Sequence, residues 1–256
     1  MTHLGAVLAL LFNAGVSHPM AFVSRDTVDE LERVSESMSG IRASRQGGDA
    51  ESVVSIGGGD SGSWTLTFGP GLPVILRRRI TAALVALSLV PGREGTALHR
   101  NIFGGNVDGA VYLDWLRSRV SRLRLGDCPS VADACALGEG ELTIPADAVG
   151  SWLGYKSVDI WLMFVHEARH LDGWLHQSCV EELAPIPGDS LSPHVAGICD
   201  LAPDGPFGAE VVMARNLESF CSNCEWNGDV RRALNRAESR IGSREARLAL
   251  SEDFRQ

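Results

Sequence analysis

The sequence predicts an α+β fold that is rich in helices, with one small sheet and one helix that carries a cluster of polar side chains. Three observations indicate it. Apolar residues recur at helical spacing in several segments, two runs of strand-forming residues flank a glycine-rich loop, and the apolar run 160–165 leads directly into histidines and a glutamate. With 256 residues, of which 45% are hydrophobic, the chain can bury one large core.

Residues 1–70 are expected to precede the main domain. An apolar stretch at 4–12 is followed by small residues up to Ala21, which is typical of a secretory signal peptide at 1–21 and too short to cross a bilayer. Residues 22–70 are then an N-terminal extension. Its expected elements are a helix at 26–38, a linker at 39–51 and two strands at 52–56 and 64–68.

The main domain is expected to run from residue 71 to 256. The pattern of apolar residues predicts helices at 73–89, 107–125, 207–222 and 229–241. Between them, Ser157 is expected to cap a further helix that has Asp159 in its first turn, where a negative charge is favourable. Residues 141–144 read as a short strand that ends at Pro145.

Charge and hydropathy narrow the possible partners. The formal net charge is −9 and the pI is near 5.3, which argues against a nucleic-acid or anionic-membrane surface. No segment after the signal is apolar for long enough to span a bilayer, so we expect no stable membrane insertion after processing.

The most informative segment is 166–176, which reads His-Glu-Ala-Arg-His-Leu-Asp-Gly-Trp-Leu-His. On a helix, His166 and His170 leave one face and can share a zinc ion, and Glu167 lies where a carboxylate can act as a general base. Gly173 can take a positive φ and end the helix, so that the chain returns His176 as a third ligand. Three protein ligands leave one position open, which is typical of catalytic rather than structural zinc.

At these eleven residues the chain resembles the metzincin zinc peptidases, with the three histidines in the ligand positions and Glu167 in the general-base position. It also resembles a group of small exported bacterial proteins of zinc-peptidase type that share the string HEARH. The resemblance implies a zincin-like fold with an active-site helix, a zinc cofactor and peptidase activity. Metzincins also carry a Met in a tight turn beneath the zinc, whereas Met213 here lies in a segment that reads as helix.

Two other residues compete with His176 for the place of third ligand. Glu210 lies in the first turns of the helix expected at 207–222, and a glutamate on a later helix completes the site in the gluzincin branch of zincins. His194 lies in a loop beside Pro193 and near Cys199. The sequence leaves the three alternatives open.

Six cysteines fall in close pairs and favour disulfides in an exported protein, either secreted or periplasmic. Pairing of nearest neighbours predicts the bonds Cys128–Cys135, Cys179–Cys199 and Cys221–Cys224. The second bond joins the segment after His176 to the loop that holds His194 and would stiffen the metal site.

We therefore expect a zinc-dependent hydrolase, a metallopeptidase in which Glu167 is the general base and a peptide or protein is the substrate. Strand 141–144 is the candidate edge strand that receives an extended substrate. We expect Arg169 to form a structural ion pair and Asp172 to orient a ligating imidazole. The alternative is a non-catalytic exported zinc-binding module, which predicts a fourth protein ligand.

Overall fold

The computed structural model describes residues 51–58, 62–128, 132–179, 187, 191, 197–220 and 227–255. The predicted signal and helix 26–38, together with His194 and the Cys221–Cys224 pair, lie outside these residues. In the described part the fold is mixed α/β, with eight α-helices and a small sheet. None of these helices has both the length and the apolar character that crossing a bilayer requires.

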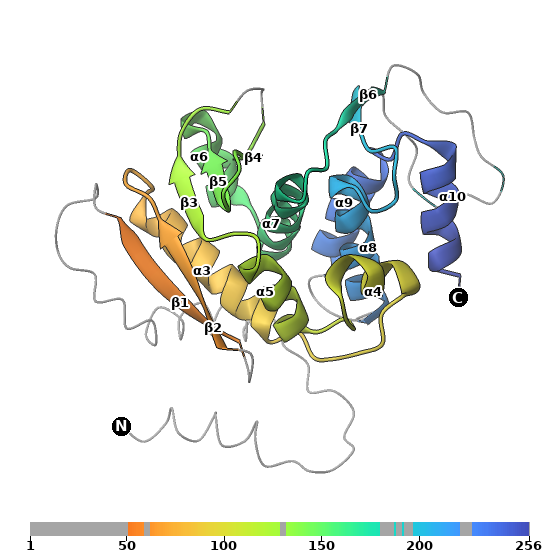
Figure 1. Ribbon diagram of the computed structural model, residues 1–256, viewed down its shortest axis with the longest axis horizontal. Helices are drawn as coiled ribbons and strands as arrows, with labels where there is room; N and C mark the ends of the chain where they lie inside the picture. The colour runs from red at the N-terminus through yellow and green to blue at the C-terminus, as the bar shows by residue number, and fades with distance from the viewer. Residues whose placement is uncertain are drawn as a thin grey trace, which may run out of the picture.

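The main sheet has five strands in the order β1-β2-β3-β5-β4 (Figure 1). Their bounds are Ser52–Gly58 (β1), Gly62–Phe68 (β2), Arg122–Leu125 (β3), Glu141–Ile144 (β5) and Cys135–Ala136 (β4). β1 and β2 form the expected antiparallel hairpin, and β2 pairs in parallel with β3, so the hairpin shares one sheet with the strands that follow it. β3 and β5 are parallel, and β4 closes the sheet antiparallel to β5.

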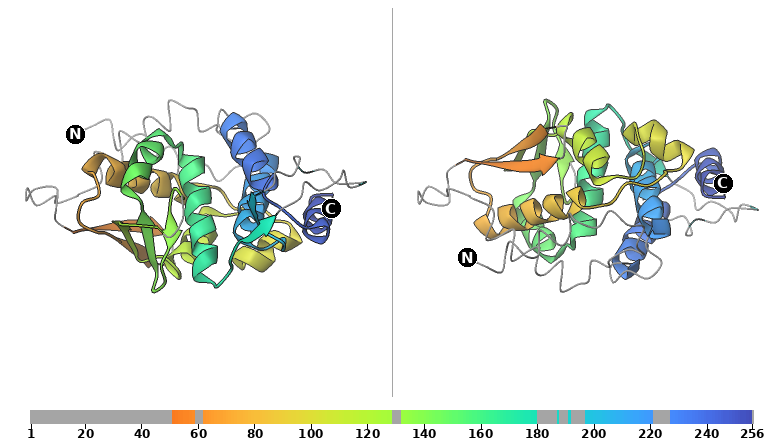
Figure 2. Two further views of the ribbon diagram at one scale, coloured as in Figure 1. Left: turned by 90° about the horizontal axis from the view of Figure 1, so that it is seen from above. Right: turned by 90° about the horizontal axis from the view of Figure 1, so that it is seen from below.

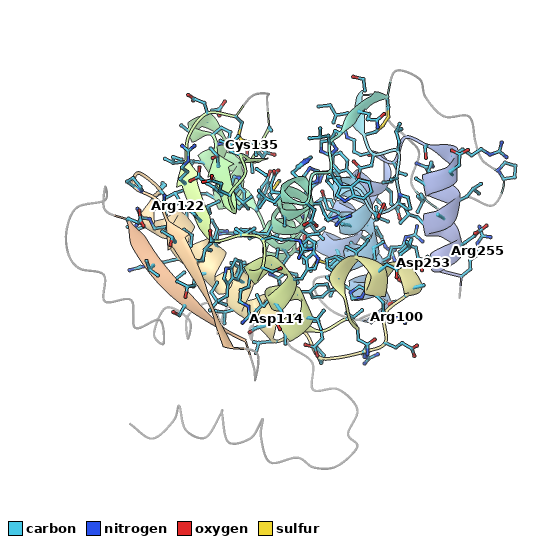
Figure 3. All side chains as sticks on the ribbon, in the orientation of Figure 1. Arg100, Asp114, Arg122, Cys135, Asp253 and Arg255 are labelled. Atoms are coloured by element: carbon cyan, nitrogen blue, oxygen red, sulfur yellow. A yellow bond between two sulfur atoms is a disulfide. The ribbon has the colours of Figure 1, made fainter. Side chains whose placement is uncertain are left out.

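The prediction that strand 141–144 is an edge strand is wrong. β5 lies between β3 and β4, and its backbone hydrogen bonds are taken up on both sides. The short strand β4, which the sequence did not predict, is the edge instead. Figure 3 labels Cys135, the first residue of this edge strand.

Some of the helices lie between the strands along the chain, and others follow the last strand of the main sheet. Their bounds are Val74–Ser88 (α3), Ala97–Phe103 (α4), Gly109–Arg117 (α5), Val149–Gly154 (α6), Ser157–Leu171 (α7), Pro206–Phe220 (α8), Asn227–Glu238 (α9) and Arg244–Asp253 (α10). α7 runs between the sheet on one side and α8 and α9 on the other, as two perpendicular directions of view show (Figures 1 and 2). It is therefore the central element of the molecule.

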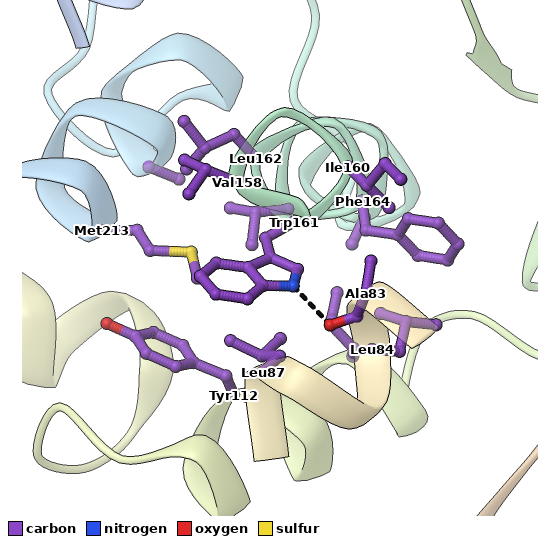
Figure 4. Packing of buried hydrophobic residues seen from close by; sticks show 14 of the residues in the cluster. Ala83, Leu84, Leu87, Tyr112, Val158, Ile160, Trp161, Leu162, Phe164 and Met213 are labelled. Atoms are coloured by element: carbon purple, nitrogen blue, oxygen red, sulfur yellow. Dashed lines mark hydrogen bonds between the residues drawn. The ribbon is translucent and has the colours of Figure 1, made fainter. Parts of the chain in front are cut away.

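Apolar side chains around most of α7 explain its central place. Trp161 is buried between α3 and α8, where its Nε1–H donates to the carbonyl of Ala83 at 2.6 Å and its ring lies near Met213 (Figure 4). Leu162 and Phe164 are completely buried on other sides of the helix. A helix that is apolar nearly all round is stable only inside a core. Because α7 lies there, His166 and Glu167 near its C-terminal end are buried as well.

Two local predictions need correction. The helix expected at 107–125 ends at Arg117, and residues 122–125 form β3. In their sequence, Arg-Leu-Arg-Leu, polar and apolar residues alternate with the period of a strand, and Leu123 is fully buried. The cap of α7 is Lys156 rather than Ser157, because the carboxylate of Asp159 accepts the Lys156 N–H at 3.0 Å.

Disulfides join Cys128 to Cys135 and Cys179 to Cys199, which confirms two of the three predicted pairs. The second joins β6 (Gln177–Cys179) to β7 (Gly197–Cys199), which form a separate antiparallel ribbon. Two disulfides indicate an oxidising, extracellular environment.

Candidate metal centre

The last turns of α7 place His166, Glu167 and His170 at the inner end of the helix. His166 and Glu167 are buried, and His170 is half-buried. α7 ends at Leu171, and Gly173 follows its C-terminal cap with a φ of 91°, the left-handed conformation expected from the sequence. The chain turns there and comes back toward the helix, which returns His176 to the face that carries His166 and His170.

The structure brings together the three predicted histidines, His166, His170 and His176, which we call the histidine cluster. The Nε2 atom of His176 lies 2.9 Å from Nε2 of His166 and 3.2 Å from Nε2 of His170. Among the described residues this is the group of His, Cys, Asp or Glu side chains that could hold a metal ion.

A second set of contacts orients the cluster. The Nδ1 atom of each imidazole faces an oxygen acceptor: Glu210 Oε1 at 2.6 Å for His166, Trp174 O at 2.7 Å for His170, and Asp200 Oδ1 at 2.9 Å for His176. A carbonyl or an ionised carboxylate oxygen can only accept, so each Nδ1 carries the proton when Glu210 and Asp200 are ionised. The three Nε2 lone pairs therefore point at one another.

This donor set fits a metal ion. Three converging lone pairs have no proton to share, and a cation between them is the partner that satisfies all three. In tetrahedral zinc sites with Zn–N bonds of about 2.0–2.1 Å, two ligating nitrogens are roughly 3.3 Å apart, close to the two Nε2 distances here. The carboxylate or carbonyl behind each imidazole is also the usual environment of ligating histidines.

Two of the histidines, His166 and His170, are held in the neutral form that binds metal. Burial, together with the charge of His176, lowers the pKa of His166 to about 3. Burial and the charge of His166 lower the pKa of His170 to about 4. Both imidazoles are therefore deprotonated at neutral pH and ready to ligate.

Glu167 is the second feature of the site. Burial, together with the charge of Glu210, raises its pKa to about 8, against the opposing effect of a backbone hydrogen bond from Ala136 on β4. Its Oε2 atom is buried and has no hydrogen-bond partner among the described residues. A buried carboxyl oxygen without a partner is costly unless a ligand or water completes it.

Glu210 lies in the site, but behind His166 rather than among the ligands. Burial also raises its pKa to about 8. A cation held by His166 would oppose that shift, since it favours the carboxylate and a donating Nδ1–H on the imidazole. Among the described residues, the group that could hold a metal ion therefore contains His176 and not Glu210, while His194 lies outside the described residues.

The role expected for Asp172 is wrong. Its carboxylate accepts from Arg169 at 2.8 Å and from Arg119 at 2.9 Å, and it does not contact an imidazole. Arg169 thus forms the structural ion pair that was predicted for it, and it also donates to the carbonyl of Asp204. The contacts of Asp172 and Arg169 therefore hold the C-terminal end of α7 in place without touching the histidine cluster.

Sequence reasoning missed Asp200, the partner of His176. The signal that could have found it is the pairing of Cys179 with Cys199, which brings the residue after Cys199 opposite His176. Phe207 was also missed: its ring stacks on His176 with the centroids 4.6 Å apart and an angle of 22°. Asp200 lies in the segment that leads into α8, and Phe207 is the second residue of that helix.

Comparisons of this chain with protein-family models, with curated proteins and with solved structures find no match. The functional argument therefore starts from the geometry of the histidine cluster and Glu167.

Proposed function

We propose that the chain is a zinc-dependent hydrolase, a metallopeptidase of the zincin type. The observation that carries the proposal is the histidine cluster with Glu167 on the same helix turn, its Oε2 atom unpartnered. Three imidazoles match the ligand set of catalytic zinc, and among the described residues no fourth side chain joins the group. A structural zinc site would need that fourth ligand, so the geometry favours the hydrolase over a non-catalytic zinc-binding module.

Zinc bound by the cluster would supply Lewis-acid polarisation of a carbonyl oxygen and would lower the pKa of water. The chain itself supplies the proton transfer. Glu167 takes a proton from the attacking water and passes it to the leaving amine. Burial prepares Glu167 for both roles, because a pKa raised toward neutrality lets the carboxyl group accept and release a proton at the same pH.

The edge strand β4 supports a peptide as the substrate. Ala136 on β4 donates its N–H to Glu167, so this strand lies directly beside the proposed general base. β5 occupies one side of β4, and an extended peptide can add to the main-chain groups on the other side that do not bond to Glu167. The substrate strand proposed at 141–144 thus moves to 135–136.

The disulfides and the predicted signal support a secreted or periplasmic protein. An exported metallopeptidase would meet its peptide or protein substrate outside the cytosol.

The variant Glu167→Gln tests the proposal. The amide keeps the size of the side chain but cannot take up a proton, so we expect zinc content and fold to be unchanged. Cleavage of a mixed peptide library should fall by roughly a hundred- to ten-thousandfold, the usual contribution of a general base. The matched control is Glu252→Gln, which changes an exposed glutamate on α10 and should leave cleavage at the wild-type rate.

Two results would contradict the proposal. Equal cleavage by the wild type and Glu167→Gln would remove Glu167 from the mechanism. A zinc-loaded, correctly processed wild type that cleaves nothing in the library would instead support the binding module.

A further inference from the structure

The ribbon of β6 and β7 joins the third histidine to its carboxylate partner. β6 begins one residue after His176, and β7 ends one residue before Asp200. Gln177 pairs with Cys199, so the next step of the register places His176 opposite Asp200. A hydrogen bond of 2.9 Å joins these two side chains next to the ends of the two strands.

The disulfide Cys179–Cys199 is the buried part of this ribbon. Both cysteines are buried, whereas the other four residues of β6 and β7 are exposed. Two short strands without a hydrophobic face are marginally stable in water, so their pairing needs another source of stability. The disulfide supplies it across a sequence separation of 20 and packs closely against Gly242, where a Cβ atom would overlap both sulfurs.

Asp200 is held independently of the ribbon. Its N–H donates to Arg240 O at 2.9 Å, its carbonyl accepts from Gly242 at 2.7 Å, and its Oδ2 accepts from Gly208 at 3.1 Å. These bonds come from the start of α8 and from the segment between α9 and α10. Asp200 therefore has a fixed place whether or not the ribbon is intact.

His176 has weaker support. Its backbone runs between the end of α7 and the ribbon, and its neighbours Leu175 and Gln177 are exposed. The C-terminal side of this short segment is fixed by Cys179. The side chain of His176 contacts Asp200 and Phe207, but in the described part of the chain its backbone is held only from its two flanking elements: the end of α7, which is fixed by the core, and the ribbon, which is fixed by the disulfide.

We propose that the Cys179–Cys199 disulfide is a positioning device that makes the third metal ligand conditional on oxidation. The inference rests on the metal site of the proposed function. With the disulfide intact, His176 is held within reach of the other two imidazoles. A dithiol reductant supplies two electrons and two protons, the Sγ–Sγ bond breaks and two thiols form. The ribbon then loses its buried link, and metal is bound by a less organised set of ligands.

The consequence is an order of events in the cell. In a reducing compartment the chain binds metal weakly. After export, oxidation of Cys179 and Cys199 completes the site. The protein is thus prevented from reaching full metal affinity before it leaves the cytosol.

The test measures zinc affinity by competition with a chromophoric chelator, using the full mature chain and zinc alone as the probe. The double variant Cys179→Ser/Cys199→Ser is preferable to reduction, because free thiols beside the site could themselves bind zinc. We expect its dissociation constant for zinc to rise by roughly ten- to a hundredfold, the range seen when the groups that orient metal ligands are lost. Circular dichroism confirms that the variant remains folded.

The matched control is Cys128→Ser/Cys135→Ser, which removes the other disulfide. That bond braces β4, which contacts Glu167 and no ligand, so zinc affinity should equal that of the wild type. If the Cys179→Ser/Cys199→Ser variant is folded and binds zinc as tightly as the wild type, the positioning role is wrong and the metal site stands. If the oxidised wild type binds no zinc, both the inference and the proposed function are overturned. Should the variant be unfolded, wild type reduced with a phosphine and then alkylated, so that its thiols cannot bind zinc, gives the second measurement, and unchanged zinc affinity there overturns the inference.

Discussion

At the scale of single residues, the acceptor behind each imidazole decides which nitrogen is free for metal. Asp200 is the acceptor that a substitution disturbs most, because its two carboxylate oxygens accept hydrogen bonds from two different donors. Oδ1 accepts from Nδ1 of His176 at 2.9 Å, and Oδ2 accepts from the backbone N–H of Gly208 at 3.1 Å. The side chain is buried, so water cannot replace either bond.

The variant Asp200→Asn should therefore weaken metal binding. Asparagine has one acceptor oxygen and one donor NH2 group, so one of the two hydrogen bonds must be lost. We expect the dissociation constant for zinc to rise by roughly ten- to a hundredfold, measured by chelator competition. The fold should persist, because the backbone bonds of Asp200 do not involve its side chain.

Asp172→Asn is the matched control for this variant. Asp172 lies closer in sequence to the histidines, but its carboxylate contacts Arg119 and Arg169 only. Zinc affinity should stay at the wild-type value. Equal weakening by the two variants would show that general electrostatics, and not the bond from Asp200 to His176, sets the affinity.

The histidine cluster itself was predictable from the sequence. The helical period fixes the relation of His166 to His170, and a glycine three residues later gives the chain a place to turn back. Asp200 and the N–H of Ala136 were not predictable, because both reach the site through tertiary contacts: the β6–β7 ribbon in one case and the edge strand β4 in the other.

At the scale of elements, the end of α7 decides whether His176 returns to the helix. Gly173 donates its N–H to His170 O at 2.9 Å, and Trp174 donates to Arg169 O at 3.3 Å. These two bonds are the Schellman arrangement that terminates a helix, and it requires a left-handed residue at the position of Gly173.

Gly173→Ala should destabilise the protein. No heavy atom lies within 4 Å of an added Cβ, so the cost is backbone strain alone, about 1–2 kcal/mol for a residue other than glycine in the left-handed region. Chemical denaturation followed by circular dichroism measures it.

Gly150→Ala is a control that should change the stability of the protein in the opposite direction. Gly150 lies in helix α6 with equally open space around it and no positive φ. An alanine there should stabilise the protein by about 0.4–1 kcal/mol, because it restricts the unfolded chain. A stabilising effect of Gly173→Ala would contradict the role given to the turn.

The elements were predicted best where the apolar pattern is long and regular. α3 and α8 appear close to their predicted bounds, because each presents buried residues at helical spacing. The segment 107–125 was wrong in its second half, since the four residues of β3 gain their pairing from β2 and β5, which are distant in sequence. Short elements such as β4 and α4 have too few residues to show a period.

At the scale of the whole molecule, α7 unites two halves of the proposed site. The sheet side supplies Ala136 and the edge strand beside Glu167, and the helical side supplies Glu210, Asp200 and Phe207 around the histidines. Each of the two described disulfides braces one half. The architecture therefore joins a half that surrounds the histidine cluster to a half that contacts Glu167, with the long central helix carrying residues of both.

The measurement that tests the central claim most directly is the zinc content of the oxidised, mature chain, purified without added metal and analysed by mass spectrometry. We expect about one zinc per chain, as in three-histidine catalytic sites. The double variant His166→Ala/His170→Ala should lose this zinc, whereas His194→Ala, which changes the alternative ligand, should retain it. Full zinc retention by the His166→Ala/His170→Ala variant, or a wild type that holds no zinc even after zinc is supplied, would contradict the account.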